Sequence, residues 1–224
     1  MEIKPIGKIL NNFNSKFGIP RQSGLCNVES LIVIEKEFSV KDAFRGIEEY
    51  SHLWLIWEFS EFASECWSPT VRPPRLGGNK RVGVFATRSP NRPNSLGLSS
   101  VRLSSVSQNE EGQIVLKVIG ADLMNGTSIF DIKPYVSYSD SHTDAVCGFA
   151  DDFAEYKLSV SFSEEAKKLL AEKEIDEISS VLSNDPKPSY QHDFHREYGM
   201  SYGKYEIKFK YSEDGIFVFD IQKI

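Results

Sequence analysis

The sequence is poor in cysteine and has no long apolar run. Its 224 residues include three cysteines, Cys26, Cys66 and Cys147, at wide and irregular spacing. This odd number without a regular pattern argues against a disulfide framework and favours a reducing cytoplasm. The longest uninterrupted apolar run, residues 53–57, is far shorter than the roughly 20 residues of a membrane-spanning helix. The first ten residues carry charges and lack an apolar core, so we predict no signal peptide.

Carboxylates are missing from one long stretch of an otherwise acidic chain. The net charge is −6, yet residues 66–109 contain no Asp or Glu and carry +7, so the remainder carries −13. The seven basic residues of this stretch are Arg72, Arg75, Lys80, Arg81, Arg88, Arg92 and Arg102. A segregated basic stretch is typical of proteins that bind a phosphate-rich partner. A solvated face whose acidic partners lie elsewhere in the fold is the alternative.

Two common glycine-containing motifs are also absent. The chain has no G-x-G-x-x-G and no phosphate-binding Walker loop. A Rossmann dinucleotide site and a P-loop nucleotidase therefore lose their main sequence support.

The apolar pattern of the first two thirds predicts strands separated by turns. The predicted strands are residues 2–10, 28–35, 52–60, 81–87, 96–106, 113–120 and 129–133. A long loop covers 11–27, and Ser39 is predicted to begin a short helix with Asp42 at the capping-box position. Regular alternation with long helices is absent, so a doubly wound sheet is not expected. The pattern favours a mainly β fold, either a barrel or a sandwich.

The pattern changes after about residue 155. Ser163 is predicted to cap a helix whose apolar positions continue to Leu182, and residues 204–221 read as a hairpin that turns at Asp214–Gly215. We therefore predict two domains, residues 1–155 and a small α+β domain of residues 156–224.

The loop within residues 81–103 suits an anionic ligand. Pro90 and Pro93 limit its backbone freedom, so less entropy is lost when its arginines bind. The planar guanidinium of arginine matches phosphate and carboxylate oxygens. Asn91 and Asn94 can bond base edges or backbone groups.

Two further stretches carry candidate chemistry. In residues 120–135, Asp131, Lys133 and Tyr135 alternate and should share one face of an extended segment, although a plain hairpin with a surface ion pair fits equally. Asp140, His142 and Asp144 also alternate, and His192 and His195 are spaced like metal ligands. Neither set completes a known metal signature, so solvated loop residues are the simpler interpretation.

Long segments of the chain resemble the TsaA-like (YaeB, TrmO) family. They are KFGIPRQSGL, EEYSHLWLIWEF, PTVRPPRLGGNKRVGVFATRSPNRPNSLGLSSVRL and GADLMNGTSIFDIKPYVSYSDS, and the match in order and spacing runs from about residue 3 to 145. The tail, DPKPSYQ and YGMSYGKYEIKF, resembles the C-terminal domain of bacterial members. The resemblance implies a β-barrel without a Rossmann unit and a homodimer. It also implies an S-adenosylmethionine-dependent tRNA methyltransferase that acts on N6 of N6-threonylcarbamoyladenosine, just 3′ of the anticodon.

The resemblance also implies which residues of this chain contact the cofactor. They are Pro20, Arg21 and Gln22 of the first loop, His52 and Leu53, Arg88, Leu98, and the turn Asn125, Gly126, Thr127 and Ser128. The family turn is D-G-T-P, so Asn125 and Ser128 depart from it. If the missing aspartate charge matters, cofactor affinity should be weaker here.

Substrate contacts are assigned from the chemistry of the anticodon loop. Phosphates would be bound by arginine and lysine, and splayed bases would stack on aromatic rings. The candidates are Arg92, Asn94, Lys133 and Tyr135, with Tyr138 as a further ring. Asp131 is the candidate base for the ureido proton, with solvent or the substrate's own carboxylate as alternatives. No metal is expected. A tRNA-binding module without chemistry, suggested by the altered turn, and a metal-dependent hydrolase using Asp140, His142 and Asp144 remain open as other functions.

Overall fold

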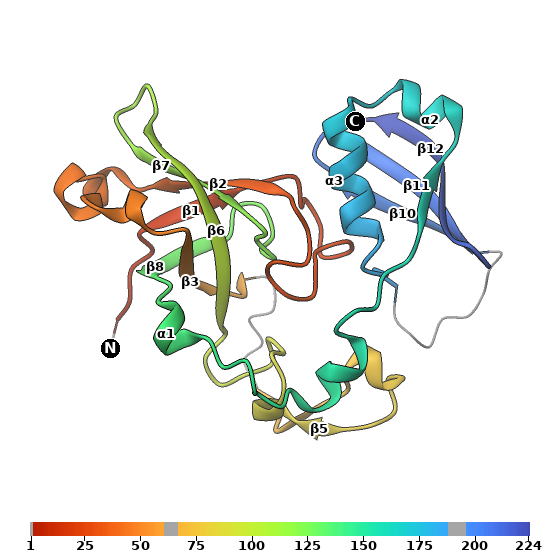
Figure 1. Ribbon diagram of the computed structural model, residues 1–224, viewed down its shortest axis with the longest axis horizontal. Helices are drawn as coiled ribbons and strands as arrows, with labels where there is room; N and C mark the ends of the chain where they lie inside the picture. Colours follow the sequence, from red (N-terminus) through yellow and green to blue (C-terminus); the bar gives the residue numbers. More distant parts are fainter. Residues whose placement is uncertain (1, 61–66, 188–195) are drawn as a thin grey trace.

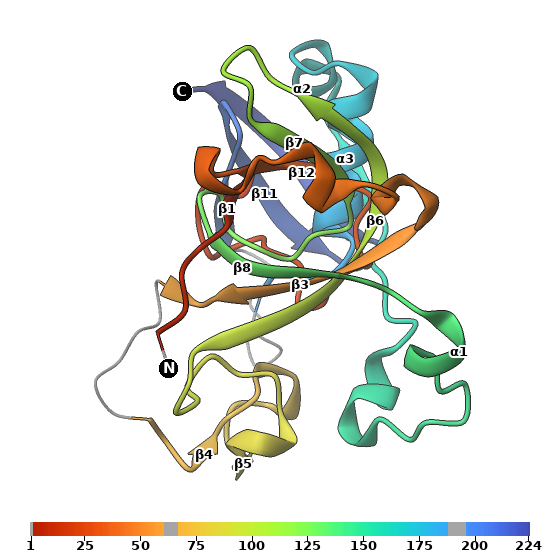
Figure 2. The same cartoon turned by 90° about the vertical axis from the view of Figure 1, so that its left-hand side faces the viewer.

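A closed six-stranded barrel forms the first part of the chain. The computed structural model describes residues 2–60, 67–187 and 196–224. The barrel strands are β1 (Gly7–Leu10), β2 (Glu29–Ile34), β3 (His52–Glu58), β6 (Leu96–Gln108), β7 (Ile114–Ile119) and β8 (Ser128–Pro134). Their order around the barrel is β1-β2-β7-β6-β3-β8, and every neighbouring pair is antiparallel. Figure 2 shows β3, β6 and β8 crossing one another around the barrel wall.

The barrel interior follows from the alternation seen in the sequence. In β3 every second side chain is buried, and the side chains that face the barrel interior are Leu53, Leu55 and Trp57. They pack with aliphatic residues from the other strands, such as Ile9, Ile32, Leu116 and Ile129. Burying such side chains stabilises the fold by about 1.5–3 kcal/mol each. The prediction of a mainly β, barrel-like, non-Rossmann fold is confirmed.

A second, smaller sheet lies beside the barrel (Figure 1). It has the order β10-β11-β12-β9, with β9 (Val160–Phe162), β10 (Glu197–Tyr202), β11 (Tyr205–Ser212) and β12 (Gly215–Lys223). Helices α2 (Glu164–Lys168) and α3 (Glu172–Leu182) pack on it. Strand β9 pairs in parallel with β12, and the other pairs are antiparallel. The small α+β unit is thus confirmed in kind, while its boundary at residue 155 stays a prediction.

The long loop of residues 11–27 belongs to the core of this second unit. Phe13, Cys26 and Val28 are buried among the side chains of α3 and of the small sheet. The ring of Phe13 lies edge-on to Tyr202 at 5.8 Å between centroids. A Cβ on Gly18, whose φ is +96°, would lie 2.3 Å from the sulfur of Met200, so only glycine fits there. The C-terminal unit therefore fixes the loop that carries Pro20, Arg21 and Gln22.

Smaller elements connect the barrel strands. They are β4 (Thr70–Val71), β5 (Val82–Gly83), α1 (Ser137–Asp140) and several 3-10 helices, including η6 (Val84–Ala86) and η7 (Gly148–Phe153). Both views place the β4–β5 segment at the lower end of the barrel (Figures 1 and 2). In the part of the chain that the structure describes, no helix is long and apolar enough to cross a membrane.

Three predicted elements differ from the structure in their limits. The strand expected at 2–10 covers only Gly7–Leu10, since Pro5 lacks a donor for the ladder. The strand expected at 81–87 pairs only at Val82–Gly83 and then tightens into η6. The single helix expected from Ser163 is broken after Lys168 into α2 and α3, although Ser163 does cap α2 by accepting a bond from the Ala166 amide at 3.1 Å.

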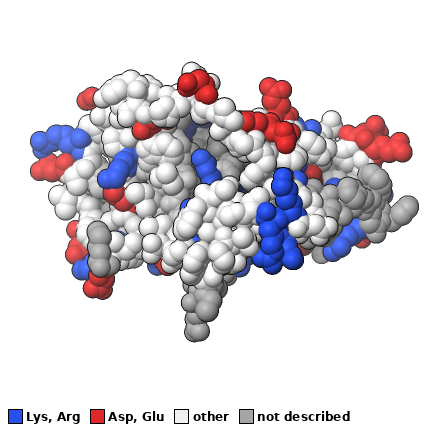
Figure 3. All heavy atoms as spheres, turned by 90° about the horizontal axis from the view of Figure 1, so that it is seen from below, with Lys and Arg blue, Asp and Glu red and all other residues white. Residues whose placement is uncertain are grey.

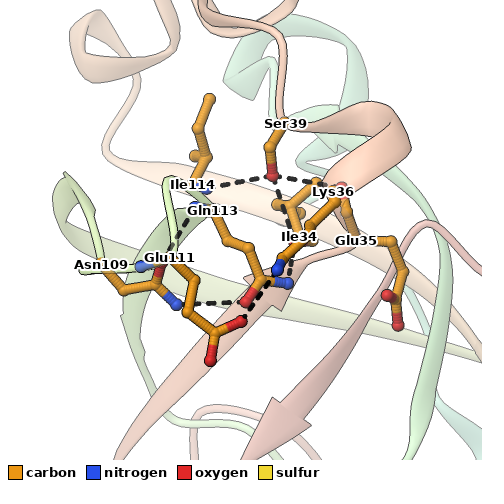
Figure 4. A network of polar contacts seen from close by, with 8 residues as sticks. All are labelled: Ile34, Glu35, Lys36, Ser39, Asn109, Glu111, Gln113 and Ile114. Atoms are coloured by element: carbon orange, nitrogen blue, oxygen red, sulfur yellow. Dashed lines mark hydrogen bonds and ion pairs between the residues drawn. The ribbon is translucent and has the colours of Figure 1, made fainter.

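Ser39 does not begin a helix, because its hydroxyl serves a different network (Figure 4). Its Oγ donates toward the carbonyls of Ile34 and Glu35 and accepts from the amide of Ile114 at 3.1 Å. Gln113 adds a bond to the Ile34 carbonyl at 2.9 Å. The hydroxyl thus ties the end of β2 to the start of β7, and the 3-10 helices η1 (Lys36–Phe38) and η2 (Lys41–Phe44) flank it.

Candidate functional site

A cavity of about 430 Å³ opens at the end of the barrel where β3 finishes and β6 begins. Loops 16–22 and 87–92 form its walls together with the segment before β8. The lining residues are Lys16, Ile19, Pro20, Arg21, Gln22, Trp57, Glu58, Phe59, Ser60, Thr87, Arg88, Arg92, Leu96, Gly97, Leu98, Asp122, Met124 and Thr127. This volume and this mixture of apolar and charged groups are typical of a small-molecule site.

Six of the predicted cofactor residues meet at this cavity: Pro20, Arg21, Gln22, Arg88, Leu98 and Thr127. Nη1 of Arg88 donates to Oε1 of Gln22 at 2.5 Å, which joins the two loops although 66 residues separate them. The side chain of Leu98 is 56% exposed, so it offers apolar surface to a ligand.

Arg21 has one donor that no partner satisfies. Its Nη2 donates to the carbonyls of Asp185 and Lys187, both at 2.9 Å, so the C-terminal unit holds the guanidinium in place. Its Nη1 is shielded from solvent and has no hydrogen-bond partner among the described residues. Burial, with Arg75 as a further cation nearby, lowers the pKa of Arg21. An unsatisfied buried donor is costly, so this guanidinium is held at some expense of stability.

Arg92 lines the same cavity but folds back onto its own loop. Its Nη1 donates to the carbonyls of Thr87 at 2.7 Å and Val84 at 3.2 Å, and the guanidinium lies 5.4 Å from the centre of the Phe85 ring. The side chain thus braces the loop that carries Arg88. Asn94 is exposed and lies outside the lining of the cavity.

The floor of the cavity holds a carboxylate that sequence reasoning missed. The indole Nε1 of Trp57 donates to Oγ of Ser99 at 2.9 Å, and this hydroxyl donates to Oδ1 of Asp122 at 2.5 Å. Burial raises the pKa of the Asp122 carboxyl, although the bond from Ser99 and the charge of Arg88 oppose that shift. The chain of bonds from Trp57 through Ser99, together with backbone bonds from Asp122 and Ser23, orients the carboxylate.

Trp57 can lie in this position because residue 97 is glycine. A Cβ on Gly97 would lie 2.2 Å from the Trp57 ring. We expect Gly97→Ala to displace the indole and to lower the free energy of unfolding by roughly 1–3 kcal/mol, as overpacking does. Thermal unfolding checks this. Gly83→Ala is the matched control, since its Cβ would meet nothing within 4 Å and its φ is −60°. Equal melting temperatures for the two variants would contradict the expectation.

The altered turn, residues 125–128, lies beside the cavity and contributes Thr127 to it. Oδ1 of Asn125 accepts from the amide of Asn11 at 3.1 Å, and Oγ1 of Thr127 donates to the Met124 carbonyl at 2.7 Å. Gly126 has a φ of +82°, which suits the tight turn. Asn125, Gly126 and Ser128 are outside the lining of the cavity, so their contact with a cofactor stays a prediction.

The remaining predicted residues lie along the other end of β3. A strand advances about 3.3 Å per residue, which puts His52 roughly 17 Å from Trp57. Leu53 is fully buried in the barrel core. The rings of His52 and Trp54 pack against Tyr135 at 6.1 and 5.5 Å between centroids. Within a single protomer, His52 and Tyr135 therefore do not line the cavity.

Asp131 and Lys133 share one face of β8, as the alternation predicted. Oδ2 of Asp131 pairs with Nζ of Lys133 at 2.9 Å; Lys133 is exposed and Asp131 is half-buried. Neither residue lines the cavity. Their assignment as base and substrate contact stays a prediction.

The suggested metal ligands do not form a cluster within the described residues. Oδ2 of Asp140 accepts bonds from Nε1 of Trp54 at 2.8 Å and from the amide of Val136 at 2.9 Å. These two bonds, that of Val136 foremost, lower the pKa of the Asp140 carboxyl. His142 and Asp144 are exposed, and no group of three possible ligands was found over residues 2–60, 67–187 and 196–224. His192 and His195 lie outside the described residues.

Of the three cysteines, Cys26 and Cys147 can be described, and both are free thiols. Burial raises the pKa of the Cys26 thiol to about 11, and the side chain packs under α3 near Ser180 and Asn184. A thiol that stays protonated is a poor nucleophile, which fits a structural role. Cys66 lies outside the described residues.

The comparisons with known proteins cover the whole chain. The family described as tRNA-methyltransferase O N-terminal domain matches residues 8–141, and the TrmO C-terminal domain matches residues 155–224. The chain is 35% identical to the tRNA (adenine(37)-N6)-methyltransferase of Escherichia coli K12, over 99% of this chain and 97% of that protein. It is 37% identical to a Pseudomonas aeruginosa protein, RcsF, whose name describes an S-adenosylmethionine-dependent methyltransferase, over 98% and 96% of the two chains.

A solved structure agrees with these sequence matches. The crystal structure of TrmO from Pseudomonas aeruginosa superimposes with a TM-score of 0.79 at 32% identity and covers 100% of this chain and 97% of its own. The barrel, the small mixed sheet and their order along the chain are thus those of a known group of enzymes, and this protein belongs to the tRNA-methyltransferase O family.

Proposed function

We propose that this protein transfers a methyl group from S-adenosylmethionine to N6 of N6-threonylcarbamoyladenosine at position 37 of tRNA. It is a tRNA (adenine37-N6)-methyltransferase by its membership of the family and by its match to the Escherichia coli enzyme along nearly the whole length. The observation that carries the proposal for this chain is the barrel-end cavity, where fixed cations and a fixed, half-buried carboxylate face one ligand space.

The residues of the cavity fit the methyl donor. Its amino-acid end carries a carboxylate and an ammonium group, and its sulfonium is a second cation. The fork of Arg88 suits the carboxylate, and Asp122 suits a cationic group. Leu96, Leu98 and Phe59 provide apolar surface for an adenine ring. When bound, S-adenosylmethionine supplies an electrophilic methyl group.

The chain's own contribution is orientation and exclusion of water. Arg88, locked to Gln22, and Asp122, locked to Ser99, hold the two charged ends of a ligand in a fixed relation. Fixed geometry of donor and acceptor accounts for much of the rate in such a transfer. A proton must also leave the ureido nitrogen of the substrate. Glu58 and Asp122 are the carboxylates among the described residues that line the cavity, and Asp131 remains the candidate base from outside it.

Asp122→Asn is expected to weaken the binding of the methyl donor while stabilising the free protein. An amide gives no charge to a ligand cation, and a bond to a charged group contributes about 1.5–3 kcal/mol, or roughly 10- to 150-fold in affinity. Because burial raises the folded-state pKa, stability from this group falls as the pH rises from the ordinary aspartate value through the raised pKa. The penalty is fully present once the pH is above the raised pKa, and the variant loses it.

Calorimetry with S-adenosylhomocysteine and thermal unfolding over the acid to neutral range measure both effects. Asp176→Asn, at an exposed position of α3, is the matched control. Unchanged affinity in Asp122→Asn would remove this carboxylate from the donor site.

We also infer a homodimer. The predicted cofactor residues form two groups in one chain, one at the cavity and one around His52 at the far end of β3. A second copy can bring its His52 and Tyr135 region to the first copy's cavity, which would explain why both groups matter for one ligand. A monomer in analytical ultracentrifugation, with and without S-adenosylhomocysteine, would contradict this. Because tRNA is its substrate, we also propose that the protein acts in the cytoplasm.

The test of the proposed function is transfer of labelled methyl groups from S-adenosylmethionine to tRNA by the purified protein. Incorporation that requires both the protein and tRNA supports it. Binding of tRNA without S-adenosylhomocysteine binding would favour a module without chemistry. Activity that EDTA abolishes would favour the metal-dependent alternative.

A further inference from the structure

A second cavity, of about 660 Å³, adjoins the first at the lower end of the barrel. Four segments line it: the β4–β5 segment, the loop at residues 21–25, the loop at residues 87–91 and the segment of η7. Four residues, Arg21, Gln22, Thr87 and Arg88, line both cavities. Ligands in the two cavities would therefore be separated only by these side chains.

The lining of the second cavity is strongly cationic. Within the part of the chain that the structure describes, it includes Arg21, Arg72, Arg75, Arg81 and Arg88 and no acidic residue. Seen from below, basic side chains gather near the middle of the molecule, on the underside where Figure 1 places the β4–β5 segment (Figure 3). This surface is what the carboxylate-free stretch of residues 66–109 produces in three dimensions.

Three of these arginines, Arg21, Arg75 and Arg88, are held by partners from other segments, and Arg72 and Arg81 are exposed. Arg75 pairs with Asp185 at 3.8 Å and lies over the rings of Phe153 and Tyr156 at 5.2 and 4.7 Å. Arg72, in contrast, is exposed and has no hydrogen bond or ion pair within the described residues. Arg81 donates from Nη1 to the Thr70 hydroxyl at 2.7 Å, which aims the rest of its guanidinium. The charge of Arg72 and Arg81 is thus available to a ligand.

An aromatic side chain stands at the opposite wall. Phe149 of η7 is half-buried and lines the cavity, while the neighbouring Phe153 has one face covered by Arg75. Arginines that follow a backbone, next to an aromatic face, are the arrangement that binds single-stranded nucleic acid. An acidic peptide would use the charges but not the ring.

We propose that this arginine-lined cavity binds the anticodon-loop nucleotides next to the methylated adenosine, with their phosphates on Arg72 and Arg81 and a base against Phe149. The identity of the RNA rests on the proposed function, because the shared wall then places the target nucleotide at the first cavity and its neighbours at the second. Arg88 and Gln22 separate the donor from the RNA, and each cavity can be tested by itself.

The first test compares Arg72→Ala/Arg81→Ala with Lys41→Ala/Arg45→Ala. The second pair removes the same charge from exposed positions around η2, at another part of the barrel. Affinity for a fluorescent anticodon stem-loop is measured by anisotropy at several salt concentrations. We expect the first variant to bind at least about tenfold more weakly, with a salt slope reduced by about 1.4 for two lost contacts to a single strand. Calorimetry with S-adenosylhomocysteine should give the wild-type affinity.

The second test replaces Phe149 with alanine and with tyrosine. Loss of the ring should weaken RNA binding about tenfold, and tyrosine should restore it, because base stacking needs only the aromatic face. Wild-type RNA affinity in the arginine variant, or the same loss in the control pair, would overturn the proposal. So would displacement of the RNA by an acidic peptide with no effect at Phe149. Failure of the proposed function is a different result, namely no methyl transfer by the wild-type protein.

Discussion

Transfer RNA that lacks the threonylcarbamoyl group is expected to accept methyl groups at less than about one hundredth of the rate of modified tRNA. The exocyclic amine of plain adenosine is conjugated with its ring and is a poor nucleophile. The modified base offers a ureido proton that is easier to remove, and it adds a carboxylate. Pairing of that carboxylate with an arginine or with Lys133 contributes about 1.5–3 kcal/mol, which is roughly 10- to 150-fold.

The experiment supplies purified enzyme and labelled methyl donor to tRNA from normal cells and from cells that cannot make the modification. The binding of both tRNAs is measured in parallel, so that a loss of chemistry is distinguished from a loss of affinity. Equal incorporation into the two preparations would mean that the substrate is plain adenosine or another position.

Arg88→Ala is expected to weaken the binding of S-adenosylhomocysteine at least about thirtyfold. The loss corresponds to about 2 kcal/mol, the lower end of the range for removing one partner of a covered charge pair. Arg88 is also the residue that joins loop 87–92 to Gln22, so its loss frees both walls of the cavity. Arg88→Lys keeps the charge without the planar fork and should recover only part of the affinity.

Arg81→Ala is the control for this measurement. It removes the same charge from the same basic stretch, but Arg81 does not line the first cavity. Calorimetry should show the wild-type affinity for Arg81→Ala and a large loss for Arg88→Ala. Similar affinities in the two variants would mean that the donor binds elsewhere.

The barrel could be predicted because its strands are apolar segments bounded by turns, and β3 alternates between buried and partly buried positions. β3 and β7 are read directly from HLWLIWE and IVLKVI, and both lie within one residue or two of the predicted limits. The segment at 81–87 was wrongly predicted as a strand, because its apolar residues do not pair in a sheet beyond Val82–Gly83. Val84 is fully buried within η6, and Phe85 is exposed beneath Arg92, so a strand-like composition here builds a tight turn that presents arginines.

The candidate site could be predicted where motifs carry it and not where only the fold assembles it. Pro20, Arg21, Gln22 and Arg88 belong to long family-like segments, and the structure brings them together. The position of Asp122 depends on a bond from Ser99, which is 23 residues away in the sequence. Ser99 in turn accepts a bond from Trp57, which is 42 residues from Ser99. The signal that could have found it is a carboxylate within the apolar run of residues 118–123, where burial calls for a partner.

The role of the C-terminal unit was likewise hidden in the sequence. The pattern of residues 11–27 does not predict that Phe13 and Cys26 pack beneath α3. It also does not predict that the carbonyls of Asp185 and Lys187 accept bonds from Arg21. These contacts make the second unit a support for one wall of the cavity. The second unit thus holds Arg21, which lines the cavity, through two of its backbone carbonyls.

The most direct measurement is the position of the transferred methyl group. Modified tRNA is incubated with the purified protein and isotopically labelled S-adenosylmethionine, digested to nucleosides and fragments, and analysed by mass spectrometry. The label should be found on N6 of the threonylcarbamoyl adenosine at position 37, and only when the protein is present. A labelled methyl group at any other nucleotide, or no transfer by a protein that binds both tRNA and S-adenosylhomocysteine, would contradict the proposed function.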